Sequence, residues 1–460
     1  MAESKQNKVL VIVIAAIAST GGLLFGFDTG VISGAIPFLQ LDFNLTDAQI
    51  EDVTAFGLIG AVIGALFGGR ITDILGRKKV ILVSAFIFAT GAWWSGAAPD
   101  ITQLLISRLY LGLAIGVSSF AVPLYIAEIS PTKIRGTLVS LFQLLITVGI
   151  LVSYLSDSAL ADNDVVSSWR PMFYMGIFPA IILFVGMFFL PETPRWLMSK
   201  GKEAEGRRVL AKIEDPEMID TAIQLMKDEL AKDADQAGWK ELFKPWMRNA
   251  LIIAIGIMFF QQFVGINTVI YYSPKIFLKA GFEGNEAAIW ASVSVGVVNV
   301  LFTILSLYLI DRLGRRKLYF IGTTGIVISL IFMGLGFALQ AQLGDMAKWF
   351  LVGSMLVYIA FFAISLGPLG WLIISEVFPL RVRGLGASIG SLSNWGFNTL
   401  VVWTFFKLMN ILGDAEVFWF FGAIGVIGLI WGYKFIPETK GVTLEKIEEH
   451  WRQGKAPNEL

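Results

Sequence analysis

The sequence predicts an all-α integral membrane protein, with twelve transmembrane helices in two six-helix bundles and short cytoplasmic helices between them. Hydrophobic residues make up 55% of the 460 residues and charged residues 16%, whereas a typical soluble domain is about 25% charged. Twelve stretches of 17 to 27 residues contain no Asp, Glu, Lys or Arg, and about 20 apolar residues cross a membrane as a helix. In addition, motifs of the first half return in the second.

These twelve charge-free stretches are the predicted spans, because strands of a membrane β-barrel would instead alternate over segments of about ten residues. The first stretch lacks a small-residue cleavage site, so we expect a retained span and not a signal peptide. The stretches cover residues 9–27, 53–69, 80–99, 109–127, 136–156, 171–191, 249–274, 287–310, 318–344, 349–375, 384–406 and 417–433.

Basic residues predict the orientation of the spans, because cytoplasmic loops are enriched in Lys and Arg. Alternate short connections carry twelve of them, namely Arg70, Arg77, Lys78, Lys79, Lys133, Arg135, Arg312, Arg315, Arg316, Lys317, Arg381 and Arg383. The other connections carry four, namely Lys275, Lys279, Lys348 and Lys407, with Arg170 opening the sixth span. This bias predicts that both termini are cytoplasmic.

One long polar stretch separates the sixth and seventh spans, and its Lys, Glu and Asp residues alternate with helix-favouring Ala and Leu. It predicts a few short cytoplasmic helices. We therefore expect an N-terminal bundle at residues 1–191, a helical linker at 192–248, a C-terminal bundle at 249–436 and a cytoplasmic tail at 437–460.

An internal repeat relates the two halves, since three motifs recur at nearly constant offsets of 248, 238 and 246 residues. They are Glu128-Ile-Ser-Pro-Thr-Lys-Ile-Arg135 with Glu376-Val-Phe-Pro-Leu-Arg-Val-Arg383, Asp73-Ile-Leu-Gly-Arg77 with Asp311-Arg-Leu-Gly-Arg315, and Pro191-Glu192-Thr193 with Pro437-Glu438-Thr439. Basic loops alone would explain the matched Lys and Arg but not the matched Glu, Asp, Pro and Gly. Two halves in the same orientation predict a transporter whose bundles move about a site near the midplane.

The composition excludes several kinds of partner and site. Basic and acidic residues balance at 36 each without a dense basic block, so nucleic acid is not an expected partner. The chain has no cysteine and a single histidine, His450, so we expect no disulfide, no metal site and no cofactor. His450 lies in the polar tail, where we expect it to be solvated. Without an intramembrane His, Cys or carboxylate pair, an enzyme is not expected.

Five motifs are specific when they are taken together. They are Gly-Arg-Ile-Thr-Asp73-Ile-Leu-Gly-Arg77-Lys, Val-Pro123-Leu-Tyr-Ile-Ala-Glu128, Pro191-Glu-Thr-Pro-Arg195-Trp, Gln261-Gln262-Phe-Val-Gly-Ile-Asn267 and Pro437-Glu-Thr-Lys-Gly441. With them the full length of the chain resembles the sugar porter family of the major facilitator superfamily. This resemblance implies the major facilitator fold. One departure is Gly370, where many family members carry a second proline, and it leaves the bending of the tenth span open.

Asp28 and Arg108 interrupt apolar sequence in the first and fourth spans. A charge at membrane depth costs about 2.5 to 3.5 kcal/mol on insertion scales, so it needs a partner or a function. The residues alone allow a static ion pair or charges that reach the membrane surface. The resemblance implies a proton-coupling pair, whereas facilitative glucose carriers have Asn at the position of Asp28.

Neutral polar side chains within the spans form the predicted sugar site, because a polyol needs amides that donate and accept and an indole for its C–H face. They are Gln143, Gln261, Gln262, Asn267, Asn299, Asn394 and Asn398, with Trp371 as the indole. Hydrogen bonds between helices are the alternative role. The resemblance implies sugar contacts for the first six of these residues and Trp371, and adds Trp395. Phe25, Tyr271 and Tyr272 are candidates to line or gate the site.

Glycines at helical spacing, such as Gly22, Gly26, Gly30 and Gly34, predict faces for close helix packing. Gly265 and the Gly367-Pro368-Leu369-Gly370 stretch are predicted hinges. By resemblance, a network of cytoplasmic charges would join the two bundles in the outward-facing state. It comprises Asp73, Arg77, Glu128, Arg135, Glu192, Arg195, Asp311, Arg315, Glu376 and Arg383.

The predicted function is import of a neutral hexose or pentose by a monomeric proton symporter that works by alternating access among the lipids of a bacterial inner membrane. A sugar uniporter with the same site is an alternative, and Asp28 argues against it. A sugar receptor on a transporter scaffold is another alternative, although such receptors usually carry long cytoplasmic tails. The residues do not distinguish glucose from xylose or galactose.

Overall fold

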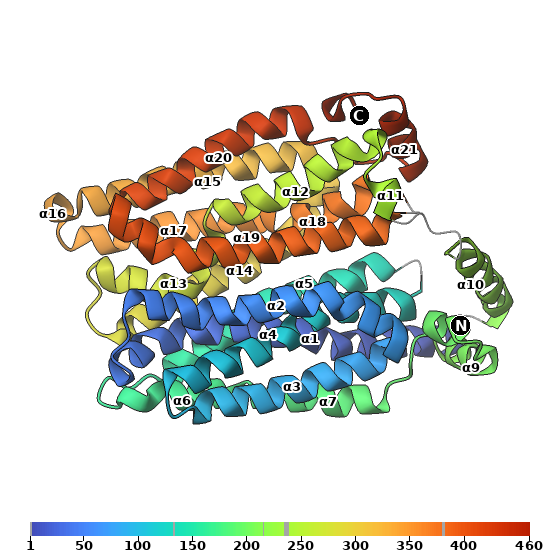
Figure 1. Ribbon diagram of the computed structural model, residues 1–460, viewed down its shortest axis with the longest axis horizontal. Coiled ribbons are helices and arrows are strands. Elements are labelled where there is room, and N and C mark those ends of the chain that lie inside the picture. Colours follow the sequence, from blue (N-terminus) through green and yellow to red (C-terminus); the bar gives the residue numbers. More distant parts are fainter. Residues whose placement is uncertain (1, 132–133, 215, 234–238, 380–381) are drawn as a thin grey trace. The chain divides into compact units, whose positions relative to one another are not determined.

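The computed structural model describes residues 2–131, 134–214, 216–233, 239–379 and 382–460 (Figure 1). Within these ranges the chain forms helices and no strand. Lys133 and Arg381, which contributed to the predicted orientation, lie outside them. Eleven helical stretches are long and apolar enough to cross a membrane. The remaining predicted span lies in α19 (Arg383–Leu412), whose 30 residues give about 45 Å of helix.

The helices follow the predicted order of spans. The first half contains α1 (Ala2–Asp42), α2 (Asp47–Leu75), α3 (Arg77–Ala97), α4 (Ile101–Ile129), α5 (Arg135–Leu160), a 3-10 turn (Val166–Ser168), α6 (Trp169–Met175) and α7 (Ile177–Phe189). The polar stretch contains α8 (Pro194–Ser199), α9 (Glu203–Ile213), a 3-10 turn (Pro216–Met218), α10 (Ile219–Asp233), α11 (Trp239–Leu242) and a 3-10 turn (Pro245–Met247). The second half contains α12 (Arg248–Phe263), α13 (Ile266–Lys279), α14 (Asn285–Leu313), α15 (Arg315–Ala338), α16 (Gln340–Leu343), α17 (Met346–Ile364), α18 (Leu366–Val377), α19, α20 (Glu416–Phe435), α21 (Leu444–Arg452) and a 3-10 turn (Pro457–Glu459).

The chain packs into two compact units. Unit 1 comprises residues 1–28, 60–149 and 173–236, and unit 2 comprises residues 29–59, 150–172 and 237–460. In unit 1, α3 packs against α4 and α7, and in unit 2, α15 packs against α17 and α20 while α12 packs against α19 (Figure 1). Unit 2 therefore includes segments of α1, α2 and α5 from the first half of the sequence. The predicted domain boundaries stay predictions.

Helix α1 continues well past the end of the first charge-free stretch. The predicted span ended at residue 27, whereas α1 runs to Asp42 and places Asp28 in its interior. A cut at every charged residue shortens a helix wherever a charge is buried with a partner, and Asp28 is buried in this way.

Glycine faces bring helices into close contact, as predicted. An added Cβ on Gly60 or Gly64 of α2 would lie 2.2 or 2.4 Å from a backbone carbonyl oxygen of α4. On α1, an added Cβ at Gly22 would lie 2.5 Å from the carbonyl oxygen of Phe142 in α5. Small residues allow such approach of two backbones, which is a main source of helix association in membranes.

Two helix breaks lie in the second half. Gly265 separates α12 from α13 with φ 86°, a conformation that glycine adopts at little cost; an added Cβ there would also lie 2.7 Å from the ring of Phe421. The predicted break at Gly367–Gly370 is displaced, since α17 ends before Ser365 and α18 begins at Leu366. Pro368 instead lies in the first turn of α18, where a missing N–H removes no helical hydrogen bond.

The tail is packed within unit 2, which corrects the prediction of a solvated His450. Its side chain is buried, and Nε2 lies 2.8 Å from the carbonyl oxygen of Ala456. Trp451 is also buried and donates from Nε1 to the carbonyl oxygen of Val377 at 3.0 Å. Helix α21 presents an apolar side, so the tail buries it instead of remaining in water.

Candidate functional site

Asp28 and Arg108 form a buried, bidentate ion pair in unit 1. Nη1 of Arg108 lies 2.5 Å from Oδ1 of Asp28, and Nη2 lies 2.9 Å from Oδ2. The exposed fractions are 7% for Asp28 and 2% for Arg108. The sequence predicted that the two charges need partners, and the structure shows that each is the partner of the other.

The described surroundings of Arg108 offer its charge little besides Asp28. The guanidinium lies 5.8 Å from the ring centre of Phe173, and Nε of Arg108 has no hydrogen-bond partner among the described residues. Removing one member of a buried ion pair leaves an uncompensated charge, which costs about 3 to 5 kcal/mol. A proton that binds Asp28 would therefore change the local free energy by several kcal/mol. This is comparable to the free-energy difference that shifts a protein from one conformation to another.

Four of the predicted amides meet in unit 2 and form a hydrogen-bonded set, which we call the amide cluster: Gln261, Gln262, Asn267 and Asn394. Nδ2 of Asn267 donates to Oε1 of Gln262 at 2.7 Å, and Nε2 of Gln262 donates to Oε1 of Gln261 at 3.2 Å. Nδ2 of Asn394 donates to the same Oε1 of Gln261 at 2.6 Å. The cluster therefore connects α12, α13 and α19 beside the break at Gly265.

Gln261 also links the cluster to the second helix break. Its Nε2 donates to the carbonyl oxygens of Leu366 and Gly367 at 2.7 and 3.2 Å. An added Cβ on Gly370 would lie 2.9 Å from that nitrogen. A larger residue than glycine at position 370 would thus crowd the amide, which gives the departure from the family pattern a physical reason.

The other predicted site residues lie apart from these hydrogen bonds. Asn398 is buried one turn from Asn394, and its Oδ1 has no hydrogen-bond partner among the described residues. Gln143 and Phe25 are half-buried in unit 1. The remaining members belong to unit 2, where Asn299, Trp395, Tyr271 and Tyr272 are buried and Trp371 is exposed.

Tyr272 packs within unit 2 as a core side chain. Its ring stacks on Phe405 with 5.5 Å between centroids, and its hydroxyl donates to the carbonyl oxygen of Val402 at 3.2 Å. Its predicted gating role stays a prediction.

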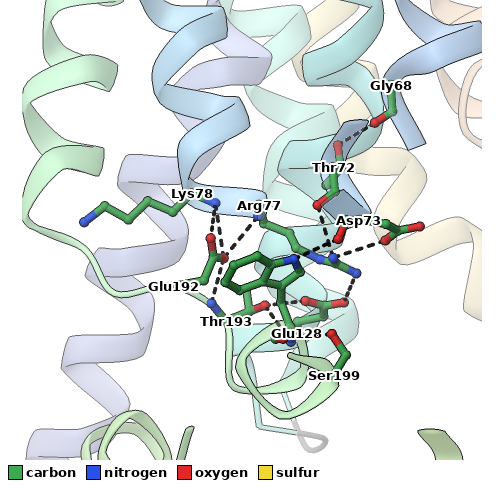
Figure 2. A network of polar contacts seen from close by, with 10 residues as sticks. Gly68, Thr72, Asp73, Arg77, Lys78, Glu128, Glu192, Thr193 and Ser199 are labelled. Atoms are coloured by element: carbon green, nitrogen blue, oxygen red, sulfur yellow. Dashed lines mark hydrogen bonds and ion pairs between the residues drawn. The ribbon is translucent and has the colours of Figure 1, made fainter. Parts of the chain in front are cut away.

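A charge cluster in unit 1 holds the start of α3 (Figure 2). Nη2 of Arg77 lies 3.0 Å from Oε1 of Glu128, and Oγ1 of Thr193 donates to the other oxygen of Glu128 at 2.6 Å. Glu192 accepts from the backbone N–H groups of Arg77 and Lys78. Burial raises the pKa of the Glu192 carboxyl, while hydrogen bonds from the Thr193, Lys78 and Arg77 backbone oppose that rise. Glu192 thus caps a helix N-terminus, where a negative charge is favourable.

The same cluster recurs in unit 2, as the sequence repeat predicts. Nη2 of Arg315 lies 2.8 Å from Oε1 of Glu376, and Oγ1 of Thr439 donates to the other oxygen, Oε2, at 2.5 Å. Glu438 accepts from the backbone N–H of Arg315 at 2.9 Å and caps α15. Asp73 and Asp311 lie 3.1 and 3.7 Å from Arg77 and Arg315, respectively. Each of these contacts joins residues of one half; the expected pairs between the bundles stay a prediction.

Arg135 and Arg383 of the predicted network do not join these clusters through a described ion pair. Arg135 is 3.4 Å from the carbonyl oxygen of Ser130 through both Nε and Nη2. Nε and Nη2 of Arg383 have no hydrogen-bond partner among the described residues, and burial lowers the pKa of this guanidinium. Arg195 is the second residue of α8, whose N-cap is Thr193. Glu128 thus pairs with Arg77 of another helix and not with Arg135 seven residues away.

Gly76→Ala should destabilise the protein, because Gly76 has φ 96° and ψ 155°, a region that is almost restricted to glycine and costs other residues about 1 to 3 kcal/mol. The new Cβ would also lie 2.3 Å from Oε2 of Glu192. We expect a lower Tm in thermal unfolding of the detergent-purified protein. Gly136→Ala is the matched control, because a Cβ there meets nothing within 4 Å. Equal Tm values for the two variants would contradict the backbone strain and the close contact with Glu192 that we assign to position 76.

One set of contacts was missed by the sequence analysis. Glu51 in α2 is fully buried, and its Oε1 accepts from the backbone N–H groups of Phe406 and Lys407 in α19 at 2.6 and 3.2 Å. Asp52 accepts from Nε1 of Trp403 at 2.8 Å. We call these bonds the α2–α19 contact. Its acidic residues are visible just before the second charge-free stretch, but nothing in the sequence indicates partners about 350 residues away.

Further polar contacts lie near the α2–α19 contact in unit 2. Lys275 of α13 pairs with Asp47 of α2 and lies 4.4 Å from the ring centre of Phe406. Tyr154 of α5 donates to the carbonyl oxygen of Ile270 at 2.6 Å. Segments of the first half are therefore held to α13 and α19 of the second half by buried polar bonds.

Comparisons with known proteins agree with this arrangement. The family model described as "Sugar (and other) transporter" matches residues 14–451. The galactose-proton symporter of Escherichia coli (strain K12) is 38% identical, covering 100% of this chain and 98% of that protein. The glucose transporter GlcP of Staphylococcus epidermidis is 39% identical, covering 98% of each.

The fold of the chain matches a solved transporter structure. The proton:xylose symporter XylE of the major facilitator superfamily, solved bound to 6-bromo-6-deoxy-D-glucose, aligns with a TM-score of 0.80 and 32% identity. The alignment covers 97% of this chain and 100% of that one. These proteins are transporters and not enzymes, and the match supports the twelve-helix, two-bundle fold. The chain therefore belongs to the sugar transporter family of the major facilitator superfamily.

Proposed function

We propose that this protein is a proton-coupled symporter that imports a neutral monosaccharide by alternating access. The observation that carries the proton coupling is the buried Asp28–Arg108 pair. A carboxylate held by one arginine in an apolar setting can exchange that partner for a proton when its surroundings change. The two relatives and the solved structure named above are a galactose-proton symporter, a glucose transporter and a proton:xylose symporter, which supports the substrate class.

The amide cluster is the proposed sugar site. Each amide offers two donor hydrogens and an acceptor oxygen, and the bonds within the cluster use part of that capacity. The unpaired Oδ1 of buried Asn398 adds an acceptor one turn away on α19. A buried polar atom without a partner costs about 1 to 3 kcal/mol, so a sugar hydroxyl that satisfies it would bind favourably. Gln143 and Trp371 are proposed as further sugar contacts.

A facilitative uniporter is the second candidate, because the same amides would serve it. Asp28 distinguishes the two, since a uniporter has no use for a buried carboxylate that can take up a proton. The decisive experiment is uptake into proteoliposomes with a panel of labelled hexoses and pentoses, with and without an imposed pH gradient. Accumulation above equilibrium only with the gradient is expected; equilibration without accumulation would make the protein a uniporter.

The proposed location is a bacterial inner membrane, with both termini in the cytoplasm and the protein acting as a monomer. The excess of Lys and Arg in alternate connections supports this orientation. On that orientation, the α2–α19 contact lies at the outer end of the helices. We propose that it is an outer gate, closed in this structure, because it ties the first half of the chain to the second within unit 2.

Glu51→Gln should open this gate more often. The amide keeps the shape of the side chain but has no negative charge to accept the hydrogen bonds from the backbone N–H groups of Phe406 and Lys407. Hydrogen bonds to a charged group contribute about 1.5 to 3 kcal/mol. The chain has no cysteine, so Thr54→Cys, at a buried position, provides a single label site. Maleimide labelling of Thr54→Cys should become about tenfold faster in the Glu51→Gln background.

Asp345→Asn is the matched control for this experiment, because Asp345 pairs with Lys348 at an exposed position of the same face. It should leave the labelling rate unchanged. Met346→Cys, at an exposed position, should label at one rate in every background. An unchanged rate at residue 54 in Glu51→Gln would mean that the contact does not hold the gate closed.

A further inference from the structure

Asp157 is a buried carboxyl group in unit 2 to which nothing above assigns a role. It follows the fifth charge-free stretch and lies near the end of α5, with 0% of its surface exposed. Neither Oδ1 nor Oδ2 has a hydrogen-bond partner among the described residues. This differs from Asp28, whose two oxygens both face Arg108.

The carboxyl is pressed against α1. An added Cβ on Gly34 would lie 2.4 Å from Oδ2 of Asp157 and 2.6 Å from its Cβ. One turn earlier, an added Cβ on Gly30 would lie 1.8 Å from Oγ of Ser153. Asp157 and Ser153 therefore lie in one contact, the α1–α5 seam, in which glycines of α1 face side chains of α5.

The titratable groups around Asp157 do not include a described cationic partner. Tyr154 faces it from one turn earlier on α5, and Tyr271 of α13 is also close to Tyr154. The hydroxyl of Tyr154 is already bonded to the carbonyl oxygen of Ile270. From α1, the side that faces Asp157 presents Gly34.

Two carboxyls of α1, those of Asp28 and Asp42, have partners of their own. Asp28 pairs with Arg108, and Asp42 accepts from Nε1 of Trp169 at 2.8 Å. An ionised carboxylate without a partner pays a desolvation penalty of several kcal/mol, whereas a neutral carboxyl pays only that of a polar group. The packing in the α1–α5 seam therefore accommodates the protonated acid and not the anion.

The place of Asp157 in the fold connects its proton to the gate. Residues three apart on a helix lie on neighbouring positions of one face, and Tyr154 bonds α13 three residues before Asp157. Leu151 and Tyr154 also pack against Gly296 of α14. Separation of α5 from α13 and α14 would thus loosen the surroundings of Asp157 and admit water to it.

We propose that Asp157 is a second proton-binding site, which takes a proton from water and stays protonated while the α1–α5 seam is packed. Asp157 is protonated in the packed state and ionised once water reaches it, so the packed state binds one proton more. Low pH therefore favours the packed state. The linkage is at most one proton, which limits the effect to about tenfold per pH unit within the range where Asp157 titrates. This proposal does not require proton coupling by Asp28, so the two proposals are tested independently.

Infrared spectroscopy of the detergent-purified protein tests the protonation directly. At neutral pH the wild type should show the carbonyl stretch of a protonated carboxylic acid that exchanges slowly in heavy water. Asp157→Asn should remove that band, and Asp42→Asn should leave it. Spectra of wild type and Asp157→Asn that are identical in this region would overturn the proposal.

Labelling of Thr54→Cys tests the consequence for the gate. Because the thiolate and not the thiol reacts with maleimide, the rate at residue 54 is divided by the rate of Met346→Cys at the same pH. This ratio should rise with pH in the wild-type background by up to about tenfold per unit, and it should lose that rise in Asp157→Asn. Ser153→Ala is the matched control from the same seam and should keep the pH dependence. If Asp157→Asn does not fold, Asp157→Ser provides a smaller neutral side chain with the same expectation. A rise of this ratio with pH that persists in both neutral variants would also overturn the proposal.

Discussion

We expect Asp28→Asn to bind sugar and to exchange it across the membrane, and to lose all accumulation driven by a pH gradient. Asparagine keeps the size of the side chain but cannot take up or lose a proton. One proton that moves inward down 100 mV releases about 2.3 kcal/mol, enough for roughly fifty-fold accumulation of a neutral sugar at one-to-one coupling. Uptake of labelled sugar into proteoliposomes with and without the gradient measures this loss.

The alternative for Asp28 is a purely structural pair, and it predicts another pattern. Asn would leave Arg108 uncompensated in unit 1, at a cost of about 3 to 5 kcal/mol, so expression, Tm and sugar binding would all fall. Asp42→Asn is the matched control, since Asp42 is another α1 carboxyl and accepts a described hydrogen bond from Nε1 of Trp169. If Asp28→Asn still concentrates sugar when a pH gradient is applied, Asp28 is not the coupling site and the symport assignment loses its main support.

Gln262→Ala should abolish high-affinity sugar binding while the protein remains folded. Gln262 bonds only to other members of the amide cluster in the described hydrogen bonds, so its loss leaves the helix breaks intact. Two or more hydrogen bonds to a sugar, at about 0.5 to 1.5 kcal/mol each, correspond to a loss of about tenfold to a hundredfold in affinity. Isothermal calorimetry on the purified protein measures the change.

Two comparisons separate a binding role from a structural one at this site. Gln261→Ala should lower the Tm as well as the affinity, because Gln261 also bonds the carbonyl oxygens of Leu366 and Gly367. Gln340→Ala removes an amide that bonds the carbonyl oxygen of Lys279 outside the cluster, and it should leave sugar affinity unchanged. Wild-type affinity in Gln262→Ala would remove the amide cluster as the sugar site.

The spans and the repeat could be predicted from the sequence because both depend on local properties. A helix that crosses hydrocarbon needs about 20 apolar residues wherever it occurs, so the charge-free stretches identify the spans without any knowledge of packing. The boundaries were less accurate. Asp28 ended the first predicted span although α1 continues to Asp42. The position of a charge in the sequence does not indicate that Arg108 compensates it.

The candidate site was predictable in its residue types and not in its contacts. Intramembrane amides and charges stand out against apolar sequence, so Asp28, Arg108 and the amide cluster were identified as sets. The partners in the charge clusters were different from those nearest in sequence: Glu128 pairs with Arg77, and Glu376 with Arg315. The repeat indicated that the two halves would share a pattern but not which residues would meet.

By itself, therefore, the sequence determined the helical membrane fold, the twofold repeat and the polar side chains available for a ligand, because hydropathy, motif spacing and residue chemistry are properties of the chain. Only the tertiary structure decided that Glu51 accepts hydrogen bonds from backbone groups of α19, that the tail buries His450, and that Asp157 lies against Gly34 without a described hydrogen-bond partner. These contacts join residues that are distant in the chain, and they depend on the register at which helices pack. Small shifts of that register would change every such pair while leaving the hydropathy of each helix the same.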